Sequence, residues 1–473
     1  MNFQSFQFLV FFLVVLFTAR VILKKFPASK KLFLLAASYF FYMCWDWRFA
    51  GLILVITVIN FIVGHKIQNA ENSVTKKRWL GLSVGISIGI LGYFKYVDFF
   101  IDSMNVALTS IGFGGELPLL NVLLPIGISF YTFQSISYTL DIYRGRSDAV
   151  ESFSDFALFV AFFPQLVAGP IVRASYFLPQ LNSDHKEEPN AMESGMALII
   201  RGFIKKVAFA DVLAVHLVDP AFADPGQYSP VFLLVGIYAY SYQVYMDFSG
   251  YTDIARGVSR TLGYELQINF NRPYQAISVS NFWQRWHISM SSFFRDYLFF
   301  GLGGSKYGNV YINLMLTFIA IGIWHGAGWN FVLYGAMHGA FVGLERWRRN
   351  KRKAAGVSEP EYHGIRLAIQ WFWIFNVVAF SRLLFRGGSL ESAIEYGKAM
   401  TNFAVTLIPF STVGIIVFVL AIMLQYSRTG WTTGWKDFYC RIPVAIQSML
   451  IVGVLYTLVA LSSEEAPFIY FQF

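Results

Sequence analysis

Charged residues are scarce in this sequence. Asp, Glu, Lys and Arg together make up 14% of its 473 residues, whereas soluble domains carry about 25%. Hydrophobic residues reach 56%, phenylalanine occurs 49 times, and the mean hydropathy is +0.51. So little charge excludes an ordinary soluble domain and predicts an all-α polytopic membrane protein. The length leaves room for about ten to twelve transmembrane helices of roughly 20 residues each.

Other features that the sequence lacks exclude several kinds of site. Cys44 and Cys440 are the only cysteines, too few for a disulfide framework or a cysteine-bound metal. The seven histidines include no pair at the i, i+4 spacing of a helical metal site, so no metal is expected. The G-x-S-x-G pattern occurs only within the apolar run Leu80–Tyr96 and not at the sharp turn that a nucleophile elbow requires. No internal repeat is evident, and we expect a single integral-membrane domain over residues 1–473.

Basic residues outnumber acidic ones and give a net charge of +9. They cluster between apolar runs, which indicates membrane orientation rather than nucleic-acid binding. The run Phe6–Phe17 lacks a basic leader and a cleavage site, so we interpret it as a retained first span. The positive-inside rule then places Lys24, Lys77 and Lys351 in the cytoplasm. Both termini, including the acidic Glu464, are expected outside.

Apolar runs also predict where the membrane helices lie. Six runs predict further spans: Leu32–Tyr42, Leu52–Val63, Leu80–Tyr96, Leu367–Leu384, Val413–Leu424 and Val444–Leu461. Between residues 122 and 180 the apolar sequence is interrupted by Pro125, Pro164, Pro170 and Pro179, which predicts broken or re-entrant backbone. Met196–Leu217 predicts a helix in the cytoplasmic interface, held by anionic lipid and by its apolar face.

Polar side chains are unusually frequent between Tyr238 and Arg272. Carboxylates in this stretch are too costly to face lipid. We therefore expect Asp247 and Asp253 to pair with basic residues or to line a wet cavity, and we interpret both as scaffold residues.

The stretch Asn281–Gly339 contains three of the seven histidines, His287, His325 and His338, in otherwise apolar sequence. An imidazole at membrane depth is costly unless it faces protein or water, so the pattern predicts a polar site. The glycines beside His325 and His338 let other backbone or a ligand approach closely. A neutral imidazole, with an ordinary pKa near 6.5, can take the proton of an alcohol. General-base catalysis is the favoured interpretation, and core packing is the alternative for each histidine.

Short motifs follow one another along the chain. They are Leu91-Gly-Tyr-Phe-Lys-Tyr96, Leu124-Pro-Ile-Gly-Ile-Ser-Phe-Tyr131, Phe163-Pro-Gln-Leu-Val-Ala-Gly-Pro170, Gly202-Phe-Ile-Lys-Lys206, Asp247-Phe-Ser-Gly-Tyr-Thr-Asp253, Phe282-Trp-Gln-Arg-Trp-His287, Arg295-Asp-Tyr-Leu298 and Ile323-Trp-His-Gly326. In this order they resemble the membrane-bound O-acyltransferase (MBOAT) family, and within it the bacterial alginate O-acetyltransferase membrane subunits. The resemblance runs from the N-terminus to at least His338.

The resemblance implies a fold, a site and a reaction. The fold is a ring of transmembrane helices with broken or re-entrant helices around a central tunnel, and the catalytic core is at about residues 120–345. The family's invariant histidine corresponds to His325. Its second signature position, a histidine or asparagine after Arg-Trp, corresponds to His287, so both are candidate catalytic residues. The family moves an acyl group from a cytoplasmic thioester, here expected to be acetyl-CoA, to a hydroxyl, without a tightly bound cofactor or metal.

The resemblance also implies a place and a partner. We expect the bacterial cytoplasmic (inner) membrane, with both termini periplasmic. The expected acceptor is an exported polysaccharide such as alginate, reached directly or through a periplasmic serine-hydrolase-like partner. Peptidoglycan or another cell-envelope glycan is the alternative acceptor. A transporter, or a scaffold of an export complex, is the alternative without chemistry.

Six further residues are candidates for substrate binding: Arg285, Ser291, Arg295, Trp324, Asn330 and His338. The two arginines suit the phosphates of coenzyme A, and pairing of Arg295 with Asp296 is the alternative. Packing is an equal alternative for His338, and tryptophans at such positions usually pack. His185, in a polar loop, is expected to be dispensable.

Overall fold

The computed structural model describes residues 1, 3–167, 169–181, 187–427 and 429–461. All regular secondary structure within these ranges is helical, which confirms the all-α class predicted from the sequence. His185 and Glu464 lie outside the described residues. The described chain forms two compact units, one of residues 1–200, 254–267 and 438–461, the other of residues 201–253 and 268–437.

Helices of the first unit come mainly from the N-terminal part of the chain. They are α1 (Phe6–Phe17), η1 (Thr18–Ile22), α2 (Pro27–Met43), α3 (Trp47–Gln68), α4 (Ser73–Ser110), α5 (Ile128–Tyr143), α6 (Phe153–Ala161), α7 (Phe163–Leu166), α8 (Ala174–Phe177), η2 (Leu178–Leu181) and α20 (Val444–Leu461). Three helices contain residues of both units: α9 (Ala191–Phe203), α11 (Pro230–Thr261) and α19 (Thr429–Arg441).

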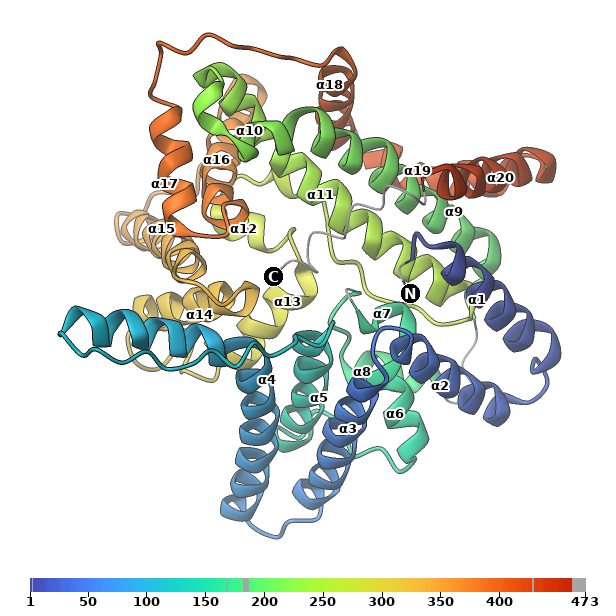
Figure 1. Ribbon diagram of the computed structural model, residues 1–473. Coiled ribbons are helices and arrows are strands. Elements are labelled where there is room, and N and C mark those ends of the chain that lie inside the picture. The colour runs from blue at the N-terminus through green and yellow to red at the C-terminus, as the bar shows by residue number, and fades with distance from the viewer. Residues whose placement is uncertain (2, 168, 182–186, 428, 462–473) are drawn as a thin grey trace. The chain divides into compact units, whose positions relative to one another are not determined.

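In the first unit, α3, α4 and α5 lie side by side (Figure 1). Buried Asn60 of α3 donates to Ser87 of α4 at 3.3 Å and accepts from Ser83 of α4 at 2.6 Å. The hydroxyl of Ser83 also lies 3.0 Å from that of Thr139 in α5. Side chains of three helices thus satisfy one another's polar atoms, which is how membrane helices tolerate polar residues at their contacts.

Prolines break the helices of this unit where the sequence predicted interruptions. α5 begins three residues after Pro125, Pro164 lies in the first turn of the four-residue α7, and Pro179 lies in the 3-10 helix η2. Proline fixes φ and lacks an N–H donor, so it is tolerated at the start of a helix and not in its interior. The stretch from residue 122 to 180 therefore contains one longer helix, α5, followed by a series of short ones.

Helices of the second unit are mostly shorter. They are η3 (Ile204–Asp211), η4 (Ala214–Val218), α10 (Asp219–Ala223), η5 (Pro225–Gln227), η6 (Pro273–Gln275), α12 (Val279–Trp283), α13 (Ile288–Phe293), η7 (Phe294–Phe299), α14 (Val310–His325), α15 (Trp329–Ala354), α16 (Gly364–Arg386), α17 (Leu390–Ala399) and α18 (Thr412–Tyr426). In this unit α14 packs along α15, and α16 and α12 pack against α15 (Figure 1).

Among the described residues, three helices are long and apolar enough to cross a membrane: α3, α4 and α16. The pair Gly434–Arg441 and Val444–Val454 joins them if a bend of 116° is counted as one broken span. Shorter apolar helices occupy Phe6–Ile22, α14 and α18. The sequence predicted a span within each of these helices except α14 and Gly434–Arg441. The larger ring of ten to twelve spans stays a prediction.

Two glycines let α14 and α15 cross at very short range. A Cβ added at Gly322 would lie 2.1 Å from the carbonyl oxygen of Phe331, and one added at Gly335 would lie 2.3 Å from that of Phe318. Backbone of the neighbouring helix therefore occupies the place of a side chain at both positions. The crossing places the end of α14, with His325, directly beside the first turns of α15.

Replacing Gly335 by alanine is therefore expected to lower the free energy of unfolding by about 1–3 kcal/mol, the usual range for overpacking. The measurement is the thermal unfolding midpoint of the purified protein in detergent. Gly343→Ala is the matched control on the same helix, since its Cβ would meet nothing closer than a ring carbon of Tyr311 at 3.8 Å. That control is expected to be neutral or slightly stabilising, because alanine favours helix over glycine. Equal midpoints for the two variants would contradict the close crossing.

Candidate active site

The short helix α12 carries the first part of the site and is fixed to α15 at its N-terminus. Ser278 caps it by accepting a hydrogen bond from the Asn281 amide. Glu345 of α15 accepts from the backbone N–H and the hydroxyl of Ser280, at 2.9 and 2.7 Å, and from the Val279 amide. A carboxylate at a helix N-terminus satisfies N–H groups that have no partner inside the helix. The end of α12 and the residues that follow are thereby held against α15.

His287 follows α12 and starts α13 in an unusual backbone conformation. Its φ of 44° and ψ of 54° are left-handed, which is uncommon outside glycine. The Ile288 amide donates to the Asn269 carbonyl at 2.9 Å, and the Nδ1 atom of His287 lies 3.3 Å from the Asn269 side-chain oxygen. An amide oxygen only accepts hydrogen bonds, so Nδ1 donates to Asn269. The imidazole is fully buried, and this contact fixes its orientation.

His325 is the last residue of α14 and lies in an aromatic enclosure. It is 4% exposed, and its ring centre lies 5.2 Å from that of Phe385, 6.0 Å from that of Tyr334 and 5.0 Å from that of Trp324. The Trp324 ring also lies 5.5 Å from the ring of His287. One indole therefore contacts both candidate catalytic histidines, which are 38 residues apart in the sequence.

His338 continues this cluster, and both of its ring nitrogens are engaged by neighbouring side chains. The indole N–H of Trp283 donates to Nδ1 at 3.3 Å, and Nε2 lies 3.1 Å from the hydroxyl of Ser381. Its ring centre is 4.6 Å from that of Tyr334. His338 is fully buried. These contacts suit a residue that orients its neighbours, and its predicted role in substrate binding stays a prediction.

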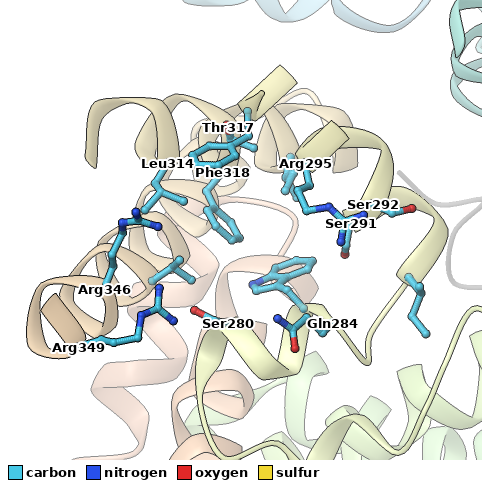
Figure 2. A pocket seen from close by; sticks show the side chains of 15 residues that line it. Ser280, Gln284, Ser291, Ser292, Arg295, Leu314, Thr317, Phe318, Arg346 and Arg349 are labelled. Atoms are coloured by element: carbon cyan, nitrogen blue, oxygen red, sulfur yellow. The ribbon is translucent and has the colours of Figure 1, made fainter. Parts of the chain in front are cut away.

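A cavity of about 350 Å³ is lined by residues of α12, α13, α14 and α15 and of the segments between them (Figure 2). Arg346 and Arg349 of α15 lie on one side of it, and Arg295 lies on the other, next to Ser291 and Ser292. Trp283 and Gln284 form part of its lining, with Ser280 near them. Along α14 the wall is made by Leu314, Thr317, Phe318 and Ile321, one residue or pair from each successive turn. His325 follows Ile321 by one turn, so the cavity extends from the arginines toward the catalytic candidate.

The remaining predicted substrate-binding residues divide between this cavity and the scaffold. Ser291 and Arg295 line the cavity, and Arg295 also forms the expected ion pair with Asp296 at 2.8 Å. Arg285 instead donates to the Asn281 side chain at 3.0 Å and to the Asn271 carbonyl. Asn330 is buried and donates to the Leu384 carbonyl at 2.8 Å, which ties α15 to α16. Among the described residues, no group of three His, Cys, Asp or Glu side chains gathers in a way that would hold a metal ion.

The family model of the membrane-bound O-acyltransferases matches residues 146–385, which include all of these site residues. Over 472 residues the chain is 36% identical to the probable alginate O-acetylase AlgI of Pseudomonas putida, with 94% of each chain covered. The chain belongs to the membrane-bound O-acyltransferase family. It is also 34% identical to the peptidoglycan O-acetyltransferase of Helicobacter pylori, over 84% of this chain and 79% of that one. Its identity to the teichoic acid D-alanyltransferase of Streptococcus thermophilus is 31%, over 58% and 70% of the two chains.

The family membership decides between the alternatives that the sequence left open. This chain is an O-acyltransferase, as its relatives' names are those of O-acetylases and acyltransferases. Its apolar helices give it membrane character. The comparisons thus favour the acyltransferase over the alternative of a transporter or a scaffold without chemistry.

The acidic residues of α11 form ion pairs with the segment that precedes it, as the sequence predicted. Asp253 binds Arg201 and Lys205, each at 2.7 Å, and Asp247 binds Lys206 at 2.8 Å. Burial by itself would lower the pKa of Lys206, but Asp247 and Asp211 raise it above its ordinary value. These basic groups therefore hold α9 and η3 against α11, and the expected contact of this segment with anionic lipid stays a prediction.

Sequence reasoning missed Arg382 of α16. It is 1% exposed, and its guanidinium carbon lies 4.3 Å from the ring centre of Trp286. A signal was present, because an ionisable residue inside a predicted span marks a functional or tightly packed position. Only its spatial neighbour Trp286, from the segment between α12 and α13, gives that signal a meaning.

Proposed function

We propose that this acyltransferase moves an acetyl group from acetyl-CoA, bound from the cytoplasm, to a hydroxyl of an exported polysaccharide. The observation that supports this best is the cavity that runs from three arginines along α14 to within one turn of His325. Arginine is suited to phosphate recognition because its guanidinium presents several N–H donors in a fixed plane. The apolar wall along α14, made by Leu314, Phe318 and Ile321, suits the thioester arm, which carries no charge.

His325 acts as the general base in this proposal. The acceptor oxygen attacks the thioester carbonyl carbon while His325 takes the hydroxyl proton, and the carbonyl electron pair moves to the oxygen. The tetrahedral adduct then collapses: the C–S bond breaks, the carbonyl re-forms, and the coenzyme A thiolate takes the proton from His325. The aromatic enclosure of His325 excludes water and so favours transfer over hydrolysis.

His287 supports His325 through their common neighbour Trp324. With hydrogen on Nδ1, its Nε2 atom is able to accept a hydrogen bond from the acceptor hydroxyl or to relay a proton. The two alternative roles of His287 are orientation of the substrate and proton transfer.

The proposed direction of transfer follows from the charges. Two of the three cavity arginines, Arg346 and Arg349, lie on the last turns of α15, in the basic run that the positive-inside rule places in the cytoplasm. The donor would enter there, and both termini would be periplasmic in the bacterial inner membrane. The polysaccharide acceptor, alginate or another cell-envelope glycan such as peptidoglycan, would be reached on the outer side directly or through a separate serine-hydrolase-like partner.

The test of the function is acetyl transfer by the purified protein in lipid vesicles, from radiolabelled acetyl-CoA to an oligosaccharide or to the partner. Arg349→Ala is expected to raise KM for acetyl-CoA about tenfold, because a charge-assisted hydrogen bond contributes about 1.5–3 kcal/mol, less where it is exposed. The value of kcat should change little, since the phosphates are bound equally in the ground and transition states.

Two comparisons make that test specific. Arg348→Ala removes the same charge from the same exposed helix end but does not line the cavity, so its KM should stay within about twofold of wild type. Acetyl-pantetheine has the thioester arm without phosphates, so its KM should be the same for Arg349→Ala and wild type. An equal effect of Arg349→Ala on the KM of both donors, or no effect on either, would show that the phosphates of coenzyme A do not bind in this cavity.

A further inference from the structure

The last turns of α16 contact all three histidines of the site or their direct neighbours. Phe385 packs against His325 with ring centres 5.2 Å apart, and the hydroxyl of Ser381 lies 3.1 Å from Nε2 of His338. These two residues are four apart, so they project from one face of the helix. Arg382 lies beside that face and is as buried as the histidines themselves.

Arg382 reaches the third histidine through Trp286. Its guanidinium carbon lies 4.3 Å from the centre of the Trp286 ring, which is within the range of a strong cation–π contact. Trp286 is itself 1% exposed, and it directly precedes His287. The same guanidinium lies 5.9 Å from the ring centre of Phe385. Arg382 therefore packs between the residue that fixes His287 and the residue that packs on His325.

The backbone of His287 needs such support. A non-glycine residue in the left-handed region is held there by its surroundings, because the conformation costs free energy on its own. The Asn269 contacts fix His287 from one side. Trp286 fixes the peptide that enters the turn, and Trp286 stands in ring contact with Phe282 and Phe270 as well.

We propose that Arg382 is a positioning residue for acyl transfer, whose guanidinium, stacked on Trp286, holds the His287 imidazole in register with Trp324 and His325. The role rests on the proposed function, because it concerns the geometry of the same histidines. Arg382 is not a catalytic residue in this account, since it acts through Trp286 and His287. A displacement of about 1 Å in such a constellation lowers a rate by about 10²-fold.

A buried arginine is a sharp probe because its removal need not harm the fold. Burying a charge is itself costly, so a hydrophobic residue of similar volume in place of the guanidinium offsets the contacts that are lost. Arg382→Met should therefore remain folded, with a thermal midpoint near that of wild type, yet lose about 10- to 100-fold in kcat. KM for acetyl-CoA should stay within about twofold, because no cavity residue is changed. Arg382→Lys keeps the charge but not the planar stack, and it should lose a similar factor.

Arg386→Met is the matched control. It lies one turn further along α16, and its side chain is about one-third exposed and pairs with Asp219. Its kcat should stay within about twofold of wild type. If Arg382→Met or Arg382→Lys retains kcat within threefold, the positioning role is wrong. Retention by Arg382→Lys alone would show that charge matters instead of the stack. If Arg382→Met does not fold, Arg382→Lys decides the question by the same criterion.

A double-mutant cycle tests the route through His287. His287→Asn removes the ring nitrogen base, and adding Arg382→Met to it should lower kcat by less than about threefold more. Losses that multiply, or a His287→Asn enzyme as fast as wild type, would overturn the proposed route. His325→Ala, measured in the same assay, distinguishes a failure of the proposed function from a failure of the role of Arg382. Activity of that variant would sink the proposed function itself, whereas an inactive His325→Ala beside a normal Arg382→Met would overturn only the role of Arg382.

Discussion

Replacing His325 by alanine is expected to lower the rate of acetyl transfer by about 10²–10⁴-fold, the range that general acid–base catalysis contributes. The imidazole is enclosed by Trp324, Tyr334 and Phe385, one turn beyond Ile321, the last cavity residue of α14. Alanine leaves that enclosure without a group to take the hydroxyl proton. The measurement is the initial rate with labelled acetyl-CoA, normalised to the amount of protein in the membrane.

Two other histidines calibrate this result. His287→Ala should also be impaired, because its neutral imidazole shares Trp324 with His325. His363 is the matched control: its side chain is 84% exposed in the segment between α15 and α16. His363→Ala should transfer acetyl groups within about twofold of the wild-type rate. A His325→Ala protein that keeps the wild-type rate would end the role of His325 as base.

The second large effect is an all-or-none dependence on the side from which each substrate is supplied. Moving a polyanion such as coenzyme A through hydrocarbon would cost tens of kcal/mol, whereas the acetyl group alone is small and nearly apolar. In sealed vesicles of known orientation, acetyl-CoA should therefore support transfer only from the side on which Arg349 lies. The acetylated acceptor should appear only on the other side, and coenzyme A should stay where it was supplied.

Orientation and leakage are the controls for that experiment. A cysteine placed at Lys351, labelled by an impermeant reagent, reports which side the end of α15 faces in each preparation. Vesicles opened with detergent should use acetyl-CoA added to either side. Equal transfer in sealed vesicles when donor and acceptor share one side would refute a two-sided mechanism, even if His325 remained essential.

Much of the site was predictable, because it contains residue types that are rare in apolar membrane sequence. Histidine in an apolar run is costly, and that cost alone marked His287, His325 and His338. The structure brings them into one cluster through Trp324 and Tyr334. We likewise expected the carboxylates Asp247 and Asp253 to pair with basic residues, because a charge is too costly to face lipid. Both carboxylates form such ion pairs.

Contacts between distant segments were not predictable. The partners of Lys205 and Lys206 on α11, Asp253 and Asp247, lie more than 40 residues away in the chain, so the sequence pattern alone suggested contact with lipid. The capping of α12 by Glu345 and the stacking of Arg382 on Trp286 join elements 65 and 96 residues apart. Sequence pattern specifies which residues need a partner, and packing decides which partner they find.

The backbone at His287 limits which amino acids can replace it during evolution. Asparagine is among the few side chains that enter the left-handed region at low cost, whereas β-branched residues are strongly disfavoured there. The codons of histidine and asparagine differ in a single base. One mutation can therefore exchange an imidazole for an amide at this place and leave the turn between α12 and α13 undisturbed. At position 287 a single mutation can therefore change the chemistry of the site without a change of fold.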